Sequence, residues 1–320
     1  MKAILIGLAA AALVLTAHAG SYSRPTSMSY DGRLVVAQQS GEVLVDGELA
    51  FTVPTEAIQE SGLVGVLADG TDIYVFYYTP EHEGRISRFD SAYQETVLYA
   101  MPNSPGYGHV GGGLVIRDGS LYAGVGSQFP NENAQDPTVP WGKVIRIDLA
   151  TGEASIYASG FRNPFTMATD GRNIYVNDVG EAAFEEVDLL VEGGNYGWPE
   201  CEGACGTYID PIYQYAHAPL PYAAITGGAF YHGTYYFADM VLGWVATMDG
   251  VVAEDVGPLI DLDVWGGTLY GLSITGGIVP VLTPVGGETL LPPPVTAVPV
   301  ATPVKGPLPR LPRTGSGGSG

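Results

Sequence analysis

One supersecondary pattern recurs six times along this chain of 320 residues, and it constrains the fold more than any other feature. Each copy has a strand rich in aromatic and β-branched residues, then a turn, then a second strand with alternating apolar residues. The copies are RLVVAQQSGEVLVDG at 33–47, DIYVFYYTPEHEGRISRFD at 72–90, SLYAGVGSQ at 120–128 with GKVIRIDLATG at 142–152, NIYVNDVGEAAFEEVDLL at 173–190, TYYFADMVLGWVATMDG at 234–250 and TLYGLSITGGIVPVLTP at 268–284. Apolar residues at a period of two are typical of strands packed in sheets.

Six similar units at a mean spacing of about 40–50 residues predict an all-β fold, a six-bladed β-propeller around a central channel. A β-sandwich also has evenly spaced strands, but nothing in that fold requires one pattern to recur. Turn-forming dipeptides precede several copies. They are Asp69-Gly70, Asp118-Gly119, Asp170-Gly171 and Gly266-Gly267. The long inserts 101–117, 127–141 and 191–233 separate the copies, and we expect them on one face, where sites are usually built.

Both ends of the chain differ from the repetitive part. Residues 1–19 combine a basic start, an apolar run and a small-residue cleavage site, which predicts a signal peptide and a secreted, periplasmic or cell-surface protein. Residues 20–290 form the predicted propeller, and no later segment is apolar for long enough to span a membrane. Residues 291–320 are rich in Pro and then in Gly and Ser, which predicts an extended linker or stalk. Its LPRTG sequence at 311–315 resembles a cell-wall attachment signal.

The charge balance excludes one large class of partners. The chain has 34 acidic residues against 13 Lys and Arg, a formal net charge of −21, whereas nucleic-acid binding needs a basic face. No Lys or Arg lies between Arg172 and Lys305, while that stretch carries 16 acids. The two cysteines, Cys201 and Cys205, predict a local disulfide in an exported protein, with half of a metal site as the alternative.

Three inserts carry residues with possible chemistry. His109 lies in a glycine-rich loop before a strand, either as a general base or as a solvent-facing loop histidine. Arg162, next to Asn163, offers a fixed cation for an anion or oxyanion, although pairing with one of many acids is the commoner fate of an arginine. Tyr196 and Trp198 form either a packing corner or the aromatic wall of a sugar site.

An ordered series of motifs carries a family resemblance. GHVGGGL, LYAGVGSQ, GKVIRID, GFRNP, DVG with an acidic pair and VD, and GGNYGWP occur between residues 108 and 199 in that order. Together with ESGLVGVLADGTDIYVFYY at 60–78, this series closely resembles the glucose/sorbosone dehydrogenase family, which includes pyrroloquinoline quinone (PQQ)-dependent sugar dehydrogenases. The resemblance covers roughly residues 24–250, and it implies a six-bladed propeller that oxidises a sugar or alcohol hydroxyl by hydride transfer to PQQ held with Ca²⁺.

The resemblance also implies roles for single residues. His109 matches the catalytic base, and Arg162 matches the cation that stabilises negative charge on the quinone or substrate. The implied cofactor contacts are Glu60, in the place of a glutamine, Arg162, Asn163, and His232, in the place of a lysine. Gln128 matches a sugar-contacting glutamine, which Tyr196 and Trp198 would join in the substrate site. The main-chain carbonyls of Gly180 and Glu181 match the pair that holds Ca²⁺.

Partners and alternatives follow from these assignments. The predicted partners are a small sugar or alcohol, an external electron acceptor and a cell wall reached through the C-terminal tail. The first alternative is a degenerate, non-catalytic propeller that binds carbohydrate or protein at the cell surface. The second is a Ca²⁺-dependent propeller lactonase, with Glu60, Asp178 and Asp239 converging in the central channel.

Overall fold

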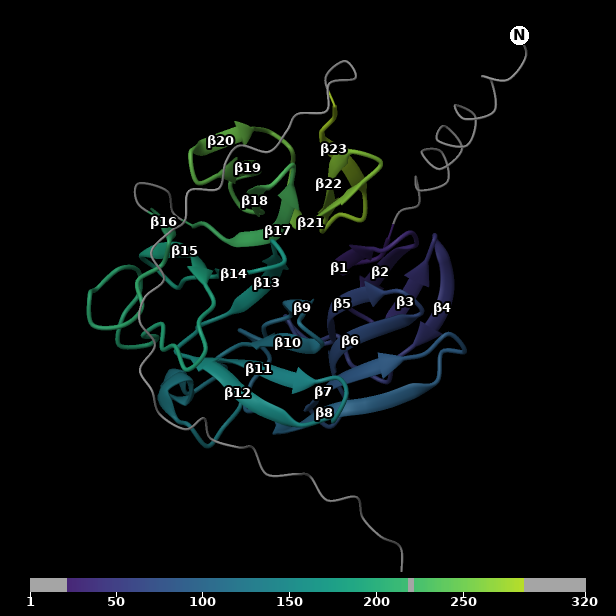
Figure 1. Cartoon of the computed structure of the whole chain (residues 1–320), viewed down its shortest axis with the longest axis horizontal. Coiled ribbons are helices and arrows are strands. Elements are labelled where there is room, and N and C mark those ends of the chain that lie inside the picture. Colours follow the sequence, from purple (N-terminus) through teal and green to yellow (C-terminus); the bar gives the residue numbers. More distant parts are fainter. Residues whose placement is uncertain (1–21, 218–221, 285–320) are drawn as a thin grey trace, which may run out of the picture.

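The computed structural model describes residues 22–217 and 222–284, in which six β-sheets surround a central channel (Figure 1). Five sheets have four strands and the last has three. The predicted all-β, six-bladed propeller is therefore confirmed. The predicted signal peptide and C-terminal linker lie outside the described residues.

Each blade runs in chain order from an inner strand at the channel to an outer strand at the rim (Figure 1). The strands of the first three blades are β1 (Pro25–Tyr30), β2 (Leu34–Gln38), β3 (Glu42–Val45), β4 (Glu48–Thr52), β5 (Leu63–Asp69), β6 (Asp72–Tyr78), β7 (Glu83–Phe89), β8 (Glu95–Asn103), β9 (Leu114–Arg117), β10 (Ser120–Val125), β11 (Lys143–Asp148) and β12 (Ala154–Ser159). Those of the last three are β13 (Pro164–Thr169), β14 (Ile174–Asp178), β15 (Phe184–Leu189), β16 (Tyr213–Ala216), β17 (Ile225–Tyr231), β18 (Thr234–Asp239), β19 (Trp244–Thr247), β20 (Gly250–Ala253), β21 (Leu259–Trp265), β22 (Thr268–Ser273) and β23 (Ile278–Leu282). A short 3-10 helix, η1 (Asn131–Gln135), lies in the insert after β10.

The dipeptides predicted as turns join the inner strand of a blade to its second strand. Between β9 and β10, for example, Asp118 and Gly119 have φ of 51° and 73°, and Arg117 pairs with Ser120. Two successive left-handed residues suit the twist of a tight hairpin, which explains the Asp-Gly sequence. All six repeated copies therefore begin within one residue of the second strand of a blade, and the inner strand precedes them.

The apolar core is divided among the six spaces between neighbouring blades. Strand β6 shows how the alternation works, because Ile73, Val75 and Tyr77 pack toward the first blade. Tyr74 and Phe76 point the other way and pack against the third blade. A strand buried on both faces reads as a nearly continuous apolar run, as in DIYVFYY. Each blade is thus stabilised by packing against two neighbours. The stability of the ring therefore also depends on packing between the last blade and the first.

Closure between the last blade and the first uses two carboxylates, the buried Asp261 and the partly buried Asp263. Asp261 Oδ2 accepts the N–H of Met28 at 2.9 Å, and Asp263 Oδ2 accepts the N–H of Tyr30 at 2.6 Å. These bonds satisfy backbone groups on the channel edge of β1 that have no ladder partner. Apolar packing between the same two blades completes the ring.

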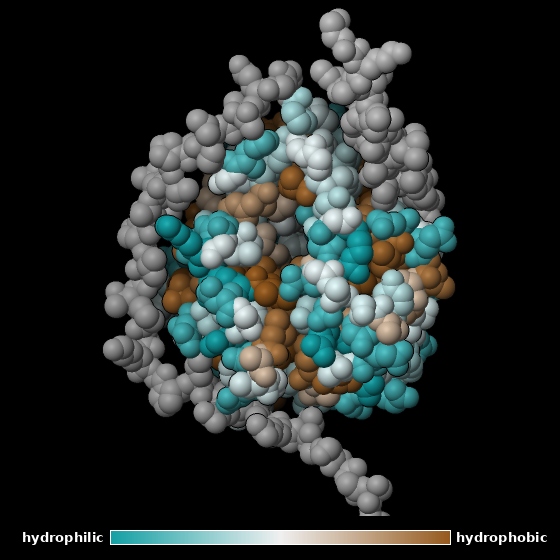
Figure 2. Space-filling view, turned by 45° about the vertical axis from the view of Figure 1, so that its right-hand side comes forward, coloured by the Kyte–Doolittle hydropathy of each residue, from teal (hydrophilic) through white to brown (hydrophobic). Residues whose placement is uncertain are grey.

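The inner strands approach closely around a channel cavity of about 300 Å³ that all six of them line. A Cβ at Gly65 would lie only 2.1 Å from the carbonyl oxygen of Gly112, so this approach requires glycine. In the space-filling view the molecule is hollowed near its centre, and apolar side chains gather around that hollow (Figure 2). The described residues contain no helix long and apolar enough to cross a membrane.

Candidate active site

One end of the channel, which we call the mouth, is formed by the loops before the inner strands and after the second strands. It opens into a cavity of about 250 Å³ with a largely apolar wall. The lining residues with a charged or amide side chain are Arg24, Gln39, Gln59, Glu60 and Asn163. Of the described residues that line it, Arg24 alone is a Lys or Arg. Sequence reasoning did not single out Arg24, which precedes the first repeat.

His109 lies beside the mouth on the loop before β9, with φ of 52°. Its backbone N–H donates to Glu60 Oε2 at 2.7 Å, and its ring packs against Phe129. Its Nε2 lies 2.7 Å from Arg162 Nη2, and its Nδ1 is buried with no hydrogen-bond partner. Burial and then the Arg162 charge lower the pKa of His109 to about 4. The imidazole is therefore neutral at physiological pH, as a general base must be.

Arg162 and Asn163 are fixed by the carboxylate of Asp178, at the end of β14. Asp178 Oδ2 accepts the N–H of Arg162 at 2.9 Å, and its Oδ1 accepts the N–H of Asn163 at 2.5 Å. Arg162 Nη1 donates to the carbonyl of Val179 at 2.8 Å, and the guanidinium lies 5.5 Å from the centre of the Trp198 ring. These contacts orient Arg162 toward His109, and they leave its buried Nε without a partner.

The structure brings together His109, Arg162, Asn163 and Glu60, as the sequence-based assignment requires. Asn163 Oδ1 accepts the N–H of Gly111 at 2.9 Å and so joins the loop of His109 to the loop of Arg162. Glu60, which is exposed, lines the mouth cavity.

Gln128 does not reach the mouth as an available sugar-binding group. Its side chain is 0% exposed, donates to Tyr78 Oη at 3.2 Å and accepts from Ser104 Oγ at 2.6 Å. Tyr78 Oη in turn donates to the carbonyl of Val110, next to His109. Gln128 therefore supports, through Tyr78, the loop that carries His109. We do not assign Gln128 to the substrate site.

The predicted aromatic wall is also buried in the protein. Tyr196 Oη donates to the carbonyl of Leu189 at 2.6 Å, and its ring stacks on Phe161 at 4.4 Å. Trp198 is buried against Arg162. Both side chains are 4–6% exposed, so they pack the insert onto the third and fourth blades instead of offering a free face to a sugar.

His232 is far from this group of residues. It is exposed on the turn between Tyr231 and Thr234, at the other end of β17 from Ala224, which lines the mouth. His232 does not reach the mouth, because β17 runs along the channel and separates Ala224 at one end from His232 at the other. Of the three acids required by the lactonase alternative, only Glu60 lines the mouth cavity, whereas Asp178 and Asp239 are occupied by backbone N–H groups.

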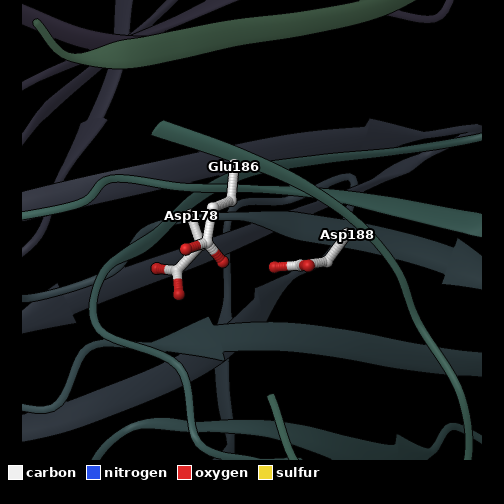
Figure 3. A group of neighbouring side chains, drawn as sticks. All are labelled: Asp178, Glu186 and Asp188. Carbon is white, nitrogen blue, oxygen red and sulfur yellow. The ribbon is translucent and has the colours of Figure 1, made fainter. Parts of the chain in front are cut away.

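A buried cluster of carboxylates lies behind Arg162, and sequence reasoning did not identify it as a group. Asp178 pairs directly with Glu186 across β14 and β15, and Asp188 follows on the same face of β15. One oxygen of each lies within 4.8 Å of the others (Figure 3). Both oxygens of Asp188 are buried without a hydrogen-bond partner. Burial first, and then the neighbouring acids, raise the pKa of Glu186 to about 8 and that of Asp188 well above its ordinary value.

Two groups of oxygen donors are therefore candidates for a hard cation such as Ca²⁺. One is this carboxylate cluster. The other is the turn at Gly180 and Glu181, which the sequence proposed and which follows β14 immediately. Cys201 and Cys205 are joined in a disulfide, which confirms the predicted bond.

A six-bladed propeller with a neutral histidine beside an arginine at the mouth of its channel is the class that fold and site define. The sequence profile of the Glucose / Sorbosone dehydrogenase family matches residues 23–236. The match covers more than half of the chain, and the chain belongs to this family.

Curated relatives support the same grouping over shorter segments. Aldose sugar dehydrogenase YliI of Escherichia coli (strain K12) is 28% identical over 43% of this chain and 44% of its own length. Quinoprotein glucose dehydrogenase B of Acinetobacter calcoaceticus is 31% identical, over 38% of this chain and 31% of its own. HIPL1 protein of Arabidopsis thaliana is 29% identical, over 41% and 28% respectively. The chain spans less than half the length of these relatives.

Solved structures support the fold. The PQQ-bound aldose sugar dehydrogenase of Streptomyces coelicolor superimposes with a TM-score of 0.70 at 20% identity, covering 85% of this chain and 94% of that one. The apo-form of the soluble aldose sugar dehydrogenase of Escherichia coli gives a TM-score of 0.67 at 19% identity, covering 81% and 95%.

Proposed function

We propose that this protein is an oxidoreductase that acts on a CH–OH group of a small sugar or alcohol at the mouth of the propeller. The observation that carries the proposal is the 2.7 Å contact between His109 Nε2 and Arg162 Nη2, on a histidine whose pKa is lowered to about 4. Membership of the family and the fold of its dehydrogenases support the reaction class.

The two side chains divide the work on the hydroxyl. A hydroxyl that enters between them donates its proton to His109 Nε2 and accepts from Arg162 Nη2, in place of their direct contact. His109 is the proton acceptor, and Arg162 stabilises the developing negative charge on the substrate oxygen. Asp178 fixes the backbone of Arg162, and the Trp198 ring packs against its guanidinium. Both contacts restrict the movement of Arg162 away from the substrate oxygen.

The hydride acceptor of the proposed reaction is PQQ, which the solved aldose sugar dehydrogenase of Streptomyces coelicolor binds, and the Acinetobacter calcoaceticus relative is a quinoprotein. When bound, it supplies a quinone that takes the hydride from carbon. The residues that would hold its polar groups are Arg24 and Asn163, which line the mouth cavity, and Arg162, which contacts His109 beside it. The partnerless Arg162 Nε is a donor of the required kind. Two guanidinium groups match two of its three carboxylates, so we propose that Ca²⁺ supplies the remaining positive charge.

The remaining parts of the proposal concern the surroundings of the enzyme. We propose an exported protein that is secreted, periplasmic or displayed at the cell surface. An external electron acceptor reoxidises the cofactor, and the C-terminal tail provides cell-wall attachment.

A binding module for neutral carbohydrate or protein is the second candidate function. It is favoured by one observation, the scarcity of basic side chains at the mouth, where Arg24 is the one Lys or Arg among the described lining residues. A site that loses its anionic cofactor would keep the propeller and the apolar cavity.

The two candidates are separated by a titration of PQQ into the purified protein, with Ca²⁺ and with a chelator, followed by dye reduction with aldoses and simple alcohols. The enzyme proposal expects saturable, Ca²⁺-dependent PQQ binding and substrate-dependent dye reduction. The absence of both would contradict it, and glycan binding without PQQ would support the binding module.

A further inference from the structure

Cys201 and Glu202, in the loop that the Cys201–Cys205 disulfide closes, line a small cavity together with Arg162, and Glu202 has an unusual environment. Glu202 Oε1 accepts four successive backbone N–H groups, from Glu181 at 2.8 Å, Ala182 at 3.0 Å, Ala183 at 2.9 Å and Phe184 at 3.1 Å. We propose that Glu202, held in place by the Cys201–Cys205 disulfide, is the positioning residue that keeps Arg162 against His109. This inference rests on the proposed function for the importance of that pair.

The first step is the turn that Glu202 binds. Residues 179–183 connect β14 to β15, and successive N–H groups of such a turn form a nest for one anion. One oxygen that accepts four N–H groups is stabilised as a charged carboxylate, and charged acceptors make stronger hydrogen bonds. Glu202 thus ties together the N–H groups of four successive residues of this turn.

The second step runs from the turn to the active pair. The carbonyl of Val179, at the start of this turn, accepts Arg162 Nη1 at 2.8 Å, and its N–H donates to the carbonyl of Asn163 at 3.1 Å. Arg162 Nη2 then lies 2.7 Å from His109 Nε2. Displacement of the turn removes the acceptor that aligns the guanidinium, and the partnerless Nε offers no second anchor.

The disulfide loop also holds Arg162 from another side. Trp198, three residues before Cys201, places its ring 5.5 Å from the guanidinium carbon. The N–H of Cys201 donates to the carbonyl of Gly197 at 2.9 Å, which links the ring segment to the disulfide. Because Cys205 closes the loop four residues later, Glu202 has little freedom to leave the nest. Reduction of the bond would release Glu202 and loosen Arg162.

The test measures the ionisation of His109 by NMR of the histidine imidazoles in the full chain, with the signal assigned by loss in His109→Gln. No cofactor or substrate is needed, so the result stands whether or not the protein is a dehydrogenase. Glu202→Ala removes the anchor, Glu202→Gln keeps an oxygen acceptor, and Glu200→Ala removes an equal charge immediately before the loop. Glu200 is exposed and contacts Tyr208, so it is the matched control.

The sign of the change discriminates between positioning and simple electrostatics. Removal of a negative charge alone would lower the pKa of His109 further, whereas release of Arg162 and entry of water raise it. We expect Glu202→Ala to raise the proton affinity of His109 at least tenfold, with Glu202→Gln and Glu200→Ala close to the wild type. An unchanged or lowered proton affinity in Glu202→Ala overturns the proposal.

A second route covers the case in which Glu202→Ala does not fold. Reduction of the wild-type disulfide, and the double variant Cys201→Ser with Cys205→Ser, are both expected to raise the proton affinity of His109 in the same direction. If His109 titrates identically in the oxidised and reduced proteins, the disulfide does not hold the positioning residue, and the proposal is overturned.

Discussion

Arg162 Nη2 and His109 Nε2 lie 2.7 Å apart at the mouth of the propeller, and the two side chains come from loops that precede different blades. Since a guanidinium is always protonated, His109 is the acceptor in this contact. The pair therefore holds a base in its neutral form next to a fixed positive charge, which is the arrangement that the proposed reaction needs.

The first prediction concerns the pH dependence of turnover. Burial and Arg162 lower the pKa of His109 to about 4, so the base should stay active as the pH falls to about 5. Arg162→Gln removes the charge but not the burial, which is the larger cause, so we expect the acidic limb of the rate profile to move to higher pH and to stay below about 6.5, the ordinary histidine value. Turnover measured as a function of pH, from about 3.5 to about 8, in the wild type and in Arg162→Gln checks this prediction. An acidic limb that does not move would show that Arg162 does not act on His109.

The second prediction concerns a glycine that allows the base loop to approach. A Cβ at Gly126 would lie 1.8 Å from the carbonyl oxygen of His109. Gly126→Ala should therefore displace His109, destabilise the protein by about 2–3 kcal/mol and reduce turnover. Gly277→Ala is the control, because a Cβ there meets nothing within 4 Å. Thermal unfolding and dye reduction are measured for both variants. Equal stability and equal turnover of Gly126→Ala and Gly277→Ala would contradict the role of Gly126.

The third prediction concerns the hydroxyl that supports the base loop. Tyr78 Oη donates to the carbonyl of Val110 and accepts from Gln128, and both partners are buried. Tyr78→Phe leaves two polar groups without a partner, so we expect a loss of about 1–3 kcal/mol of folding free energy. Tyr99→Phe should be nearly neutral in the same denaturant titration, since Tyr99 is only partly buried. A neutral Tyr78→Phe would show that water replaces the lost hydroxyl.

The fourth prediction concerns the carboxylates that close the ring. Burial raises the pKa of Asp261 and of Asp263 to about 7, above the value near 3.8 of an exposed carboxyl. The folded protein thus binds these protons more tightly than the unfolded chain. The resulting stabilisation is fully present below about pH 4 and is lost as the pH rises toward 7, at no more than about 1.4 kcal/mol per pH unit for each group.

Unfolding as a function of pH tests this account of closure. We expect the melting temperature of the wild type to fall between about pH 4 and 7, and Asp263→Asn to fall less steeply. Asp249→Asn, at an exposed position, should keep the wild-type slope. If Asp263→Asn also keeps that slope, Asp263 does not titrate in the folded state over this range.

The repeated pattern was sufficient to predict the architecture, because strands buried on both faces leave a strong apolar signal. The inner strands were harder to recognise, since crowding at the channel replaces side chains with glycine, as at Gly65 and Gly112. The resemblance grouped His109, Arg162 and Asn163, and the structure places these three residues next to one another. It also placed Glu60 at the mouth, where its carboxylate accepts the N–H of His109.

The errors came from features that spacing does not encode. His232 lies seven residues after Ile225, and the strand β17 between them places it at the opposite end of the channel. Gln128 and Tyr196 are buried by packing that no local pattern reveals. The carboxylate cluster did leave a signal, because Glu186 and Asp188 are two apart on a strand and therefore share a face. Arg24 left none, since it precedes the first repeat.

The most direct test of the proposed active site compares two histidine variants in PQQ- and Ca²⁺-loaded protein. His109→Gln should lose turnover by about 100-fold or more while PQQ binding persists, since a positioned base contributes about that much. His232→Gln, a change at the other end of the channel, should retain wild-type turnover. Full dye reduction by His109→Gln, or equal losses in both variants, would contradict the assignment of His109 as the base.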